Sequence, residues 1–251
     1  MPLALLPATL FGLLIGSFLN VVAHRLPRGE SLATPGSHCP SCAAPVKPWD
    51  NIPVLSWLLL RGRCRSCDAP IAARYPIVET VTAVLFAAVV AVHLHDTTML
   101  VLGLVLVAFL VPIALIDLDH RLILNKLTGP AAVLALVLGT ALDPGGEVER
   151  LIAGAAAGGA LLLPSLLVPG GMGMGDAKLV AVLGLYLGRG VAAAFLVAFV
   201  VGTLVGLALV LRKGMAAGRK TAIPFGPFLA LGGVVGLLAG DELVDVYLDA
   251  F

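Results

Sequence analysis

The sequence predicts an all-α membrane protein, a polytopic bundle of about eight transmembrane helices with one small polar loop. Of its 251 residues, 59% are hydrophobic and only 12% are charged, whereas a soluble domain has roughly 25% charged residues. The apolar residues come in blocks of about 20, a length that crosses a hydrocarbon core of ~30 Å. Strand-like alternation is absent, and a backbone in lipid must satisfy its own hydrogen bonds, so helices are expected rather than a barrel.

Eight apolar segments are predicted to cross the membrane. The first is interpreted as a retained helix, because a cleavable signal peptide would begin with basic residues and this segment does not. Three residues, Gly188 to Gly190, separate the sixth segment from the seventh. The predicted spans are 3–23, 77–95, 99–117, 127–142, 151–168, 177–189, 190–211 and 224–240. The chain then divides into a first transmembrane helix (1–24), a cysteine loop (25–76) and a transmembrane core (77–251).

The basic residues predict the orientation. With the N-terminus outside, 14 of the 16 Lys and Arg fall on the cytosolic side, and only Arg150 and Arg189 remain outside. This asymmetry follows the positive-inside rule. We therefore expect a multi-pass protein of the inner (plasma) membrane whose cysteine loop is cytosolic.

Every cysteine lies in the predicted loop 25–76. The stretch CPSCAAPV, which begins at Cys39, is echoed 25 residues later by CRSCDAPI, which begins at Cys64. Two such C-x-x-C turns present four thiolates to one tetrahedral ion, the pattern of a closed structural zinc site. A small loop without much of a core gains most of its order from such an ion. The expected zinc ligands are Cys39, Cys42, Cys64 and Cys67.

Two disulfides are the alternative for these cysteines. The predicted orientation places the loop in the reducing cytosol, where disulfides rarely persist, and this favours zinc. The 21 residues between the two pairs slightly exceed the usual spacing of a zinc ribbon. His38 is another candidate ligand, but four cysteines already complete the site.

Four acidic residues stand at predicted cytosolic ends of spans, where burying an ionised side chain is costly and needs a reason. Asp117 and Asp119 point to different sides of a helix, and Asp117, which directly follows an apolar run, is the better candidate for burial. Asp96 and Asp143 flank short outer loops, where a solvated charge needs no further account. The four are Glu79, Asp117, Asp119 and Asp176.

Two carboxylates held close together can form a catalytic pair. Both cannot ionise easily, so one keeps a proton near neutral pH. Such a pair can deprotonate a water molecule with one acid and protonate an amide nitrogen with the other. The glycines at 170, 171, 173 and 175 would let the backbone near Asp176 approach a substrate. Alternatively, they only allow close helix packing in lipid, and the residues alone leave both interpretations open.

The motifs resemble, in order, spacing and membrane context, those of the prepilin peptidases, the type IV pilin leader peptidases of bacteria. The resemblance runs along nearly the whole chain. It is carried by GSFLNVVAHRLP at 16–27, the two C-x-x-C pairs, RYPIVE at 74–79, ALIDLDHRLILNKLT at 114–128 and GMGMGDAKLVAVLG at 171–184.

The resemblance implies an intramembrane aspartic endopeptidase of the GxGD type, with Asp117 and Asp176 as its catalytic aspartates. It implies a prepilin or pseudopilin substrate, cut on the cytosolic side after a glycine that ends a short basic leader. Many members also methylate the new N-terminus with S-adenosylmethionine, so this cofactor is expected from the resemblance alone, and proteolysis itself needs none. The other expected partner is membrane lipid; no nucleic acid is expected.

One stretch departs from the family pattern. Leu124-Asn125 stands where the family commonly has Pro-Asp, while both catalytic positions are intact, so the departure bears on substrate preference more than on activity. Lys178 is expected either to influence the ionisation of one acid or, with a slight preference, to contact lipid phosphates.

Two rival functions are a proton-coupled transporter and a non-enzymatic scaffold with a zinc loop. Intramembrane acids often relay protons, but transporters usually have repeated halves and acids near the midplane. The helices show no such repeat, and a scaffold leaves the pair of aspartates unexplained.

Overall fold

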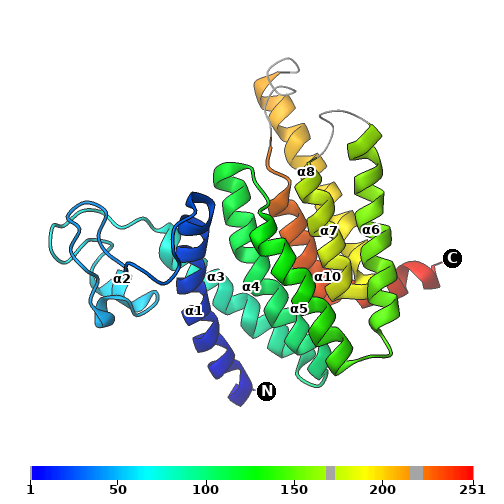
Figure 1. The fold of residues 1–251 in the computed structure, drawn as a ribbon, viewed down its shortest axis with the longest axis horizontal. Helices are drawn as coiled ribbons and strands as arrows, with labels where there is room; N and C mark the ends of the chain where they lie inside the picture. The colour runs from blue at the N-terminus through cyan, green and yellow to red at the C-terminus, as the bar shows by residue number, and fades with distance from the viewer. Residues whose placement is uncertain (1, 168–172, 215–222, 251) are drawn as a thin grey trace. The chain divides into compact units, whose positions relative to one another are not determined.

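The computed structural model describes residues 2–167, 173–214 and 223–250, and over these ranges the chain is helical with no β-strand. Seven apolar helical stretches in the described residues are long enough to cross a membrane. The predicted fold class, an all-α polytopic membrane protein, is confirmed (Figure 1). The chain forms two compact units, residues 1–94 and 95–251.

The first unit has two long helices, α1 (Pro2–Arg25) and α3 (Arg74–His93). They pack closely, because glycines of α1 leave no space for a side chain: a β-carbon at Gly12 would lie 2.6 Å from the Cα of Ala83, and one at Gly16 would lie 2.8 Å from the Cα of Glu79. These pairs run in opposite directions along the two helices, so α1 and α3 are antiparallel. In lipid the hydrophobic effect does not drive helices together, so close packing at small residues is an important source of their association.

The segment between α1 and α3 is the predicted cysteine loop. It contains only short helices: η1 (Leu26–Arg28), η2 (Pro48–Asp50) and α2 (Leu55–Leu59). The observed helix ends, Arg25 and Arg74, lie within two residues of the predicted loop boundaries, 25 and 76.

The second unit is a bundle of six longer helices among the described residues. Its core is filled by the fully buried Leu102, Leu106, Leu179, Leu183 and Leu229. The elements are α4 (Thr97–His120), α5 (Asn125–Leu142), α6 (Glu147–Leu167), α7 (Met174–Leu187), the one-turn η3 (Gly188–Gly190), α8 (Val191–Lys213) and α10 (Gly226–Asp249).

The predicted sixth and seventh spans form one continuous helical stretch, Met174–Lys213, of 40 residues. This stretch reverses direction at η3, as contacts with α10 show. A β-carbon at Gly236 of α10 would lie 3.1 Å from Leu187 in α7 and 2.8 Å from Ala194 in α8.

Two other glycines of α10 show the directions of the helices. A β-carbon at Gly240, after Gly236, would lie 2.9 Å from Gly190, and one at Gly233, before Gly236, would lie 2.7 Å from Leu183. α7 therefore runs parallel to α10, and α8 runs antiparallel to α10. α7 and α8 form a hairpin, so the seven apolar stretches of the described residues contain eight long helices, the number of spans that the sequence predicts. The 14 residues of α7 span only ~21 Å at ~1.5 Å per residue, less than the ~30 Å hydrocarbon core.

Candidate active site and metal centre

The four cysteines of the first unit form one cluster. Their sulfur atoms all lie within 4.8 Å of one another, and the Sγ atoms of Cys39 and Cys67 are 3.8 Å apart. Four sulfurs bound tetrahedrally at ~2.3 Å from a zinc ion are separated by about 3.8 Å, so the observed spacing fits one metal ion. All four are free thiols. The fold brings both C-x-x-C turns to one point, an arrangement that two separate disulfides, one within each turn, would not require.

Two equivalent turns build the cluster. In the first, the amide of Ala43 donates to the carbonyl of Cys39 at 2.9 Å; 25 residues on, the amide of Asp68 donates to the carbonyl of Cys64 at 3.0 Å. Ala43 and Asp68 both have a φ of 57°, a left-handed conformation that is uncommon outside glycine. The repeat seen in the sequence is thus a structural repeat, with each half supplying two sulfurs.

The thiols share their protons unequally. Hydrogen bonds from the backbone amides of Cys42 and Ser41 lower the pKa of Cys39 to about 6. The pKa of Cys67 is raised to about 12: the Ala69 amide opposes this rise, but the Cys42 thiol, burial and the other two thiols outweigh it. Metal binding requires thiolates, and the lowered pKa of Cys39 means that this thiol gives up its proton to a cation readily.

Two polar contacts hold the segment between the two cysteine pairs. Arg65 forms a salt bridge with Asp50, with Nη2 2.6 Å from Oδ1, and this guanidinium lowers the pKa of Asp50. The buried carboxylate of Glu79 in α3 accepts a hydrogen bond of 2.7 Å from the amide of Val54, whose φ is 59°. Glu79 therefore anchors the loop to its own unit's membrane helix, in a place where a β-branched residue holds a strained conformation.

Asp117 and Asp176 belong to the second unit. Asp117 lies three residues before the end of α4 and is only 5% exposed, whereas Asp119 is exposed. The predicted difference in burial between these two acids is confirmed. One carboxylate oxygen of Asp117, Oδ2, accepts a hydrogen bond of 2.8 Å from the amide of Gly226, the first residue of α10.

Asp176 lies in the first turn of α7 and is half-buried. Its carboxylate is near enough to that of Asp117 for their charges to repel. The two acids are 59 residues apart in sequence, at the end of α4 and the start of α7, and the fold brings them to the same end of the bundle. Two neighbouring carboxylates can share a proton, and together they can bind and deprotonate one water molecule.

The described glycines near Asp176 stand in crowded positions. A β-carbon at Gly175 would lie 2.9 Å from the Cβ of Ile123, and one at Gly173 would lie 2.8 Å from Oδ2 of Asp176. Neither glycine has a positive φ, so close packing explains them. Gly170 and Gly171 lie outside the described residues.

Lys178 has a hydrogen-bond partner that the sequence did not predict. Its Nζ atom donates to Oδ1 of Asn125 at 3.0 Å, a hydrogen bond that connects the beginning of α7 to the first residue of α5. The departure from the family pattern at Leu124-Asn125 therefore lies at a contact next to the acids.

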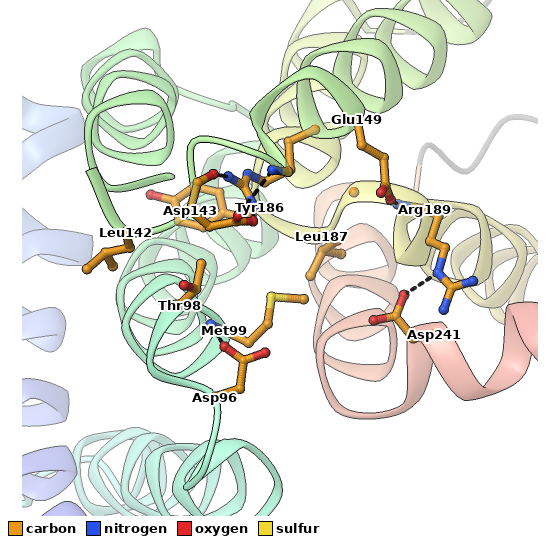
Figure 2. Close-up of a pocket in the computed structure, with 13 residues that line it drawn as sticks. Asp96, Thr98, Met99, Leu142, Asp143, Glu149, Tyr186, Leu187, Arg189 and Asp241 are labelled. Atoms are coloured by element: carbon orange, nitrogen blue, oxygen red, sulfur yellow. Dashed lines mark hydrogen bonds and ion pairs between the residues drawn. The ribbon is translucent and has the colours of Figure 1, made fainter. Parts of the chain in front are cut away.

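A cavity of about 390 Å³ occurs in the second unit, at the other end of the same helices (Figure 2). It lies among the start of α4, the end of α5, the α7–α8 turn and α10, with Met99, Leu142 and Arg189 in its lining. Met99 precedes Asp117 by 18 residues, which is ~27 Å along a helix. The cavity is therefore separate from the aspartate pair.

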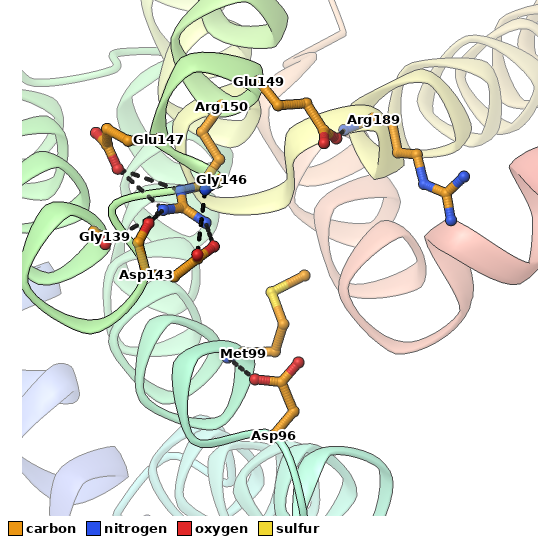
Figure 3. Close-up of polar contacts among 9 residues, drawn as sticks. All are labelled: Asp96, Met99, Gly139, Asp143, Gly146, Glu147, Glu149, Arg150 and Arg189. Carbon is orange, nitrogen blue, oxygen red and sulfur yellow. Dashed lines mark hydrogen bonds and ion pairs between the residues drawn. The ribbon is translucent and has the colours of Figure 1, made fainter.

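Arg150 closes one side of this cavity. Its buried guanidinium pairs with Asp143 at 2.9 Å and with Glu147 at 3.0 Å, and it donates to the carbonyl of Gly139 at 3.2 Å (Figure 3). The pairing lowers the pKa of Asp143, and the Gly146 amide adds to the effect. Asp143 is still partly exposed, as expected for a charge in a loop, but it is also part of a clasp around the α5–α6 turn. Asp96, the other acid beside an outer loop, caps the N-terminus of α4: its carboxylate accepts a hydrogen bond of 3.0 Å from the amide of Met99.

Gly226 is the site residue that the sequence did not single out. A signal was available, because Gly226 stands in Pro224-Phe-Gly-Pro227 at the start of an apolar span. Pro224 lies two residues before Gly226 and Pro227 directly after it. These prolines favour the start of a helix, but nothing in the pattern shows that this helix start meets Asp117.

The fold and the site define a polytopic helical membrane protein with a paired-carboxylate centre and a separate four-cysteine centre. Residues 10–93 match the bacterial peptidase A24 N-terminal domain, and residues 104–218 match the type IV leader peptidase family. The chain belongs to this family, as the sequence motifs indicate.

Three relatives illustrate the similarity, each named prepilin leader peptidase/N-methyltransferase. The protein of Aeromonas hydrophila is 40% identical, over 96% of this chain and 93% of its own length. The protein of Pseudomonas aeruginosa is 37% identical, over 98% and 94%, and that of Neisseria gonorrhoeae is 36% identical, over 96% and 93%. No solved structure matches the chain.

Proposed function

We propose that the chain is a membrane aspartic endopeptidase that removes the short basic leader from type IV prepilins or pseudopilins. The observation that carries this proposal is the approach of Asp117 and Asp176 at one end of the second unit. The names and the nearly full-length similarity of the relatives support the substrate class.

The chemistry follows from two acids that share one proton. The ionised acid takes a proton from water, the water oxygen bonds to the carbonyl carbon, and the second acid gives its proton to the carbonyl oxygen. The first acid then passes its proton to the amide nitrogen as the C–N bond breaks, and the second recovers a proton from a hydroxyl of the intermediate. Both acids end as they began, so no metal or cofactor is consumed.

The substrate approaches by its apolar helix in this proposal. The loop 25–76 is basic overall, with seven Lys and Arg against Glu30, Asp50 and Asp68, so it does not attract a basic leader by net charge. A precursor whose apolar segment partitions into the bilayer reaches the acids laterally. Because α7, which carries Asp176 in its first turn, is shorter than the hydrocarbon core is thick, this proposal places Asp176 within the depth of the bilayer.

Methylation of the new N-terminus is the second proposed activity, because the relatives' names include N-methyltransferase. S-adenosylmethionine would supply the methyl group. The cavity beside Arg150 does not fit this role, since it lies at the opposite end of the bundle from the acids that produce the new N-terminus. We therefore assign no residues to this cofactor.

The cysteine cluster is proposed to hold one structural Zn²⁺ through Cys39, Cys42, Cys64 and Cys67. The four sulfurs leave no open position for a substrate, so the ion would order the loop and take no part in cleavage. The proposed roles follow the division into a first helix (1–24), a cysteine loop (25–76) and a peptidase core (77–251).

The proposed location is the inner membrane, with the N-terminus outside and the cysteine loop and aspartates towards the cytosol. The support is the distribution of Lys and Arg, of which 14 of 16 fall on that side. A proton-coupled transporter remains the alternative function, and it is disfavoured because both acids stand at helix ends and not near the midplane.

Detergent-purified protein incubated with a prepilin precursor tests the proposal. Mass spectrometry should find one cut after the glycine that ends the leader, and one added methyl group only when S-adenosylmethionine is present. Cleavage without methylation would remove the second activity alone. An intact precursor, with proton uptake by vesicles that contain the protein, would favour the transporter.

A further inference from the structure

The N-terminus of α10 reaches into the aspartate site from 109 residues away in sequence. The Gly226 amide donates to Oδ2 of Asp117 at 2.8 Å, and both residues are buried. The first amides of a helix have no partner within the helix, so Gly226 has a free donor to offer, and the positive end of the helix favours a carboxylate there.

Gly226 also has no room for any side chain. A β-carbon would lie 2.7 Å from Oδ2 of Asp117 and 3.0 Å from its Cβ and Cγ. Such a carbon would push the carboxylate away from the amide that holds it. The φ of Gly226 is not positive, so the glycine is needed for space rather than for its backbone conformation.

The contact distinguishes the two oxygens of Asp117. Oδ2 is engaged by Gly226, whereas Oδ1 has no hydrogen-bond partner among the described residues. No buried side-chain oxygen or nitrogen in the described part of the chain lacks a partner. Oδ1 is thus the oxygen of Asp117 that the described residues leave available to a water molecule or a peptide carbonyl.

We infer that Gly226 is a positioning residue of the active site: its amide holds Oδ2 of Asp117, fixes the plane of the carboxylate, and leaves Oδ1 as the oxygen that exchanges a proton with the attacking water. This inference rests on the proposed peptidase function. α10 is then the third helix of the site, beside α4 and α7, although it carries no acid in its first turns.

Steady-state cleavage by Gly226→Ala, compared with Gly233→Ala, tests the inference. Both variants add one methyl group to α10 at a crowded position, but a β-carbon at Gly233 meets the side chain of Leu183 instead of an aspartate. We expect Gly226→Ala to lower kcat about 10- to 100-fold, as for a lost hydrogen bond to a reacting group, with KM within about twofold. Gly233→Ala should keep kcat within about threefold. Equal losses in both variants, or a loss confined to KM, would overturn the inference.

Hydrogen–deuterium exchange gives a second test that needs neither activity nor a folded Gly226 variant. Asp117→Asn keeps an acceptor oxygen for the Gly226 amide, and Asp117→Ala removes it. Peptides that cover residues 223–231 should exchange about one more amide in Asp117→Ala than in Asp117→Asn, with no change over residues 232–240. Identical exchange in the two variants would refute the contact itself. If the wild-type protein fails to cleave a prepilin while this difference appears, the peptidase proposal is wrong and the contact is right.

Discussion

Lys178 and Asn125 meet beside the aspartate pair, with Nζ 3.0 Å from Oδ1. The contact joins the helix that carries Asp176 to the first residue of α5. Because both side chains are exposed, the contact should adjust the position of α7 without holding the fold together.

Asn125→Ala should therefore slow cleavage only modestly, by about two- to fivefold, since an exposed hydrogen bond to a charged group contributes ~1 kcal/mol or less. Asn125→Asp restores an acceptor, now charged, and should cleave at least as fast as the wild type. The measurement is the initial cleavage rate, with thermal stability as the control. An Asn125→Ala variant without any activity would show that Asn125 has a larger role than this contact.

The cysteine cluster should bind about one Zn²⁺ per chain in protein purified under reducing conditions. The metal should be lost when Cys39 and Cys42 are both changed to Ser, or when Cys64 and Cys67 are, because each turn supplies two of the four sulfurs. Elemental analysis checks this, and His38→Ala is the matched control that should keep its zinc. Two disulfides and no metal would contradict both the site and the cytosolic placement of the loop.

The variants without zinc should lose protein level before they lose intrinsic rate, because a closed site supports folding and not chemistry. Rates are compared per folded molecule after size-exclusion chromatography. A folded variant with a strongly reduced cleavage rate would show that the ion takes part in more than stability.

The Arg150 clasp should stabilise the fold at neutral pH and lose this effect in acid. Arg150 holds the pKa of Asp143 below its usual value, so the stabilisation is present above the ordinary pKa of about 4 and is lost as the pH falls below it. Asp143→Asn should lower the unfolding temperature only slightly at neutral pH, because Asp143 is partly exposed and solvent weakens its ion pair.

Thermal unfolding in detergent across this pH range checks the clasp. The gap between wild type and Asp143→Asn should narrow below about pH 4. Glu242→Gln, at an exposed position of α10, should show no gap at any pH. A gap for Asp143→Asn that is constant over the whole range would mean that the ion pair does not carry the stabilisation.

Substrate delivery should depend on the precursor's apolar segment more than on salt. Deleting that segment should lower kcat/KM by about 100-fold or more, because the bilayer no longer concentrates the precursor. Raising ionic strength should change the rate by less than about twofold, although it screens exposed charges. A soluble leader peptide that is cut as fast as the full precursor, with strong salt dependence, would show that electrostatic capture dominates.

The sequence predicted what depends on periodicity and spacing. Blocks of apolar residues predicted the spans, including the hairpin at Gly188–Gly190, and the 25-residue repeat predicted the converging cysteine turns. Burial of Asp117 followed from its apolar neighbours and the helical period.

Contacts between distant segments could not be predicted in this way. The Gly226–Asp117 hydrogen bond and the Lys178–Asn125 contact depend on how helices pack, and no local pattern records that. The clasp at Arg150 was missed for a related reason. A charge at a loop is normally solvated, and only the fold shows that Asp143 and Glu147 enclose the guanidinium.

The cleavage rate of Asp-to-Asn variants tests the central claim most directly. Asp117→Asn and Asp176→Asn, which keep the side-chain size and remove the acid, should each lower the rate at least about 100-fold, the typical contribution of a general acid or base. Asp119→Asn, two residues from Asp117 and exposed, should stay within about threefold of the wild type. If Asp117→Asn cleaved the precursor normally while Asp119→Asn abolished cleavage, the aspartate pair described here would not be the catalytic pair.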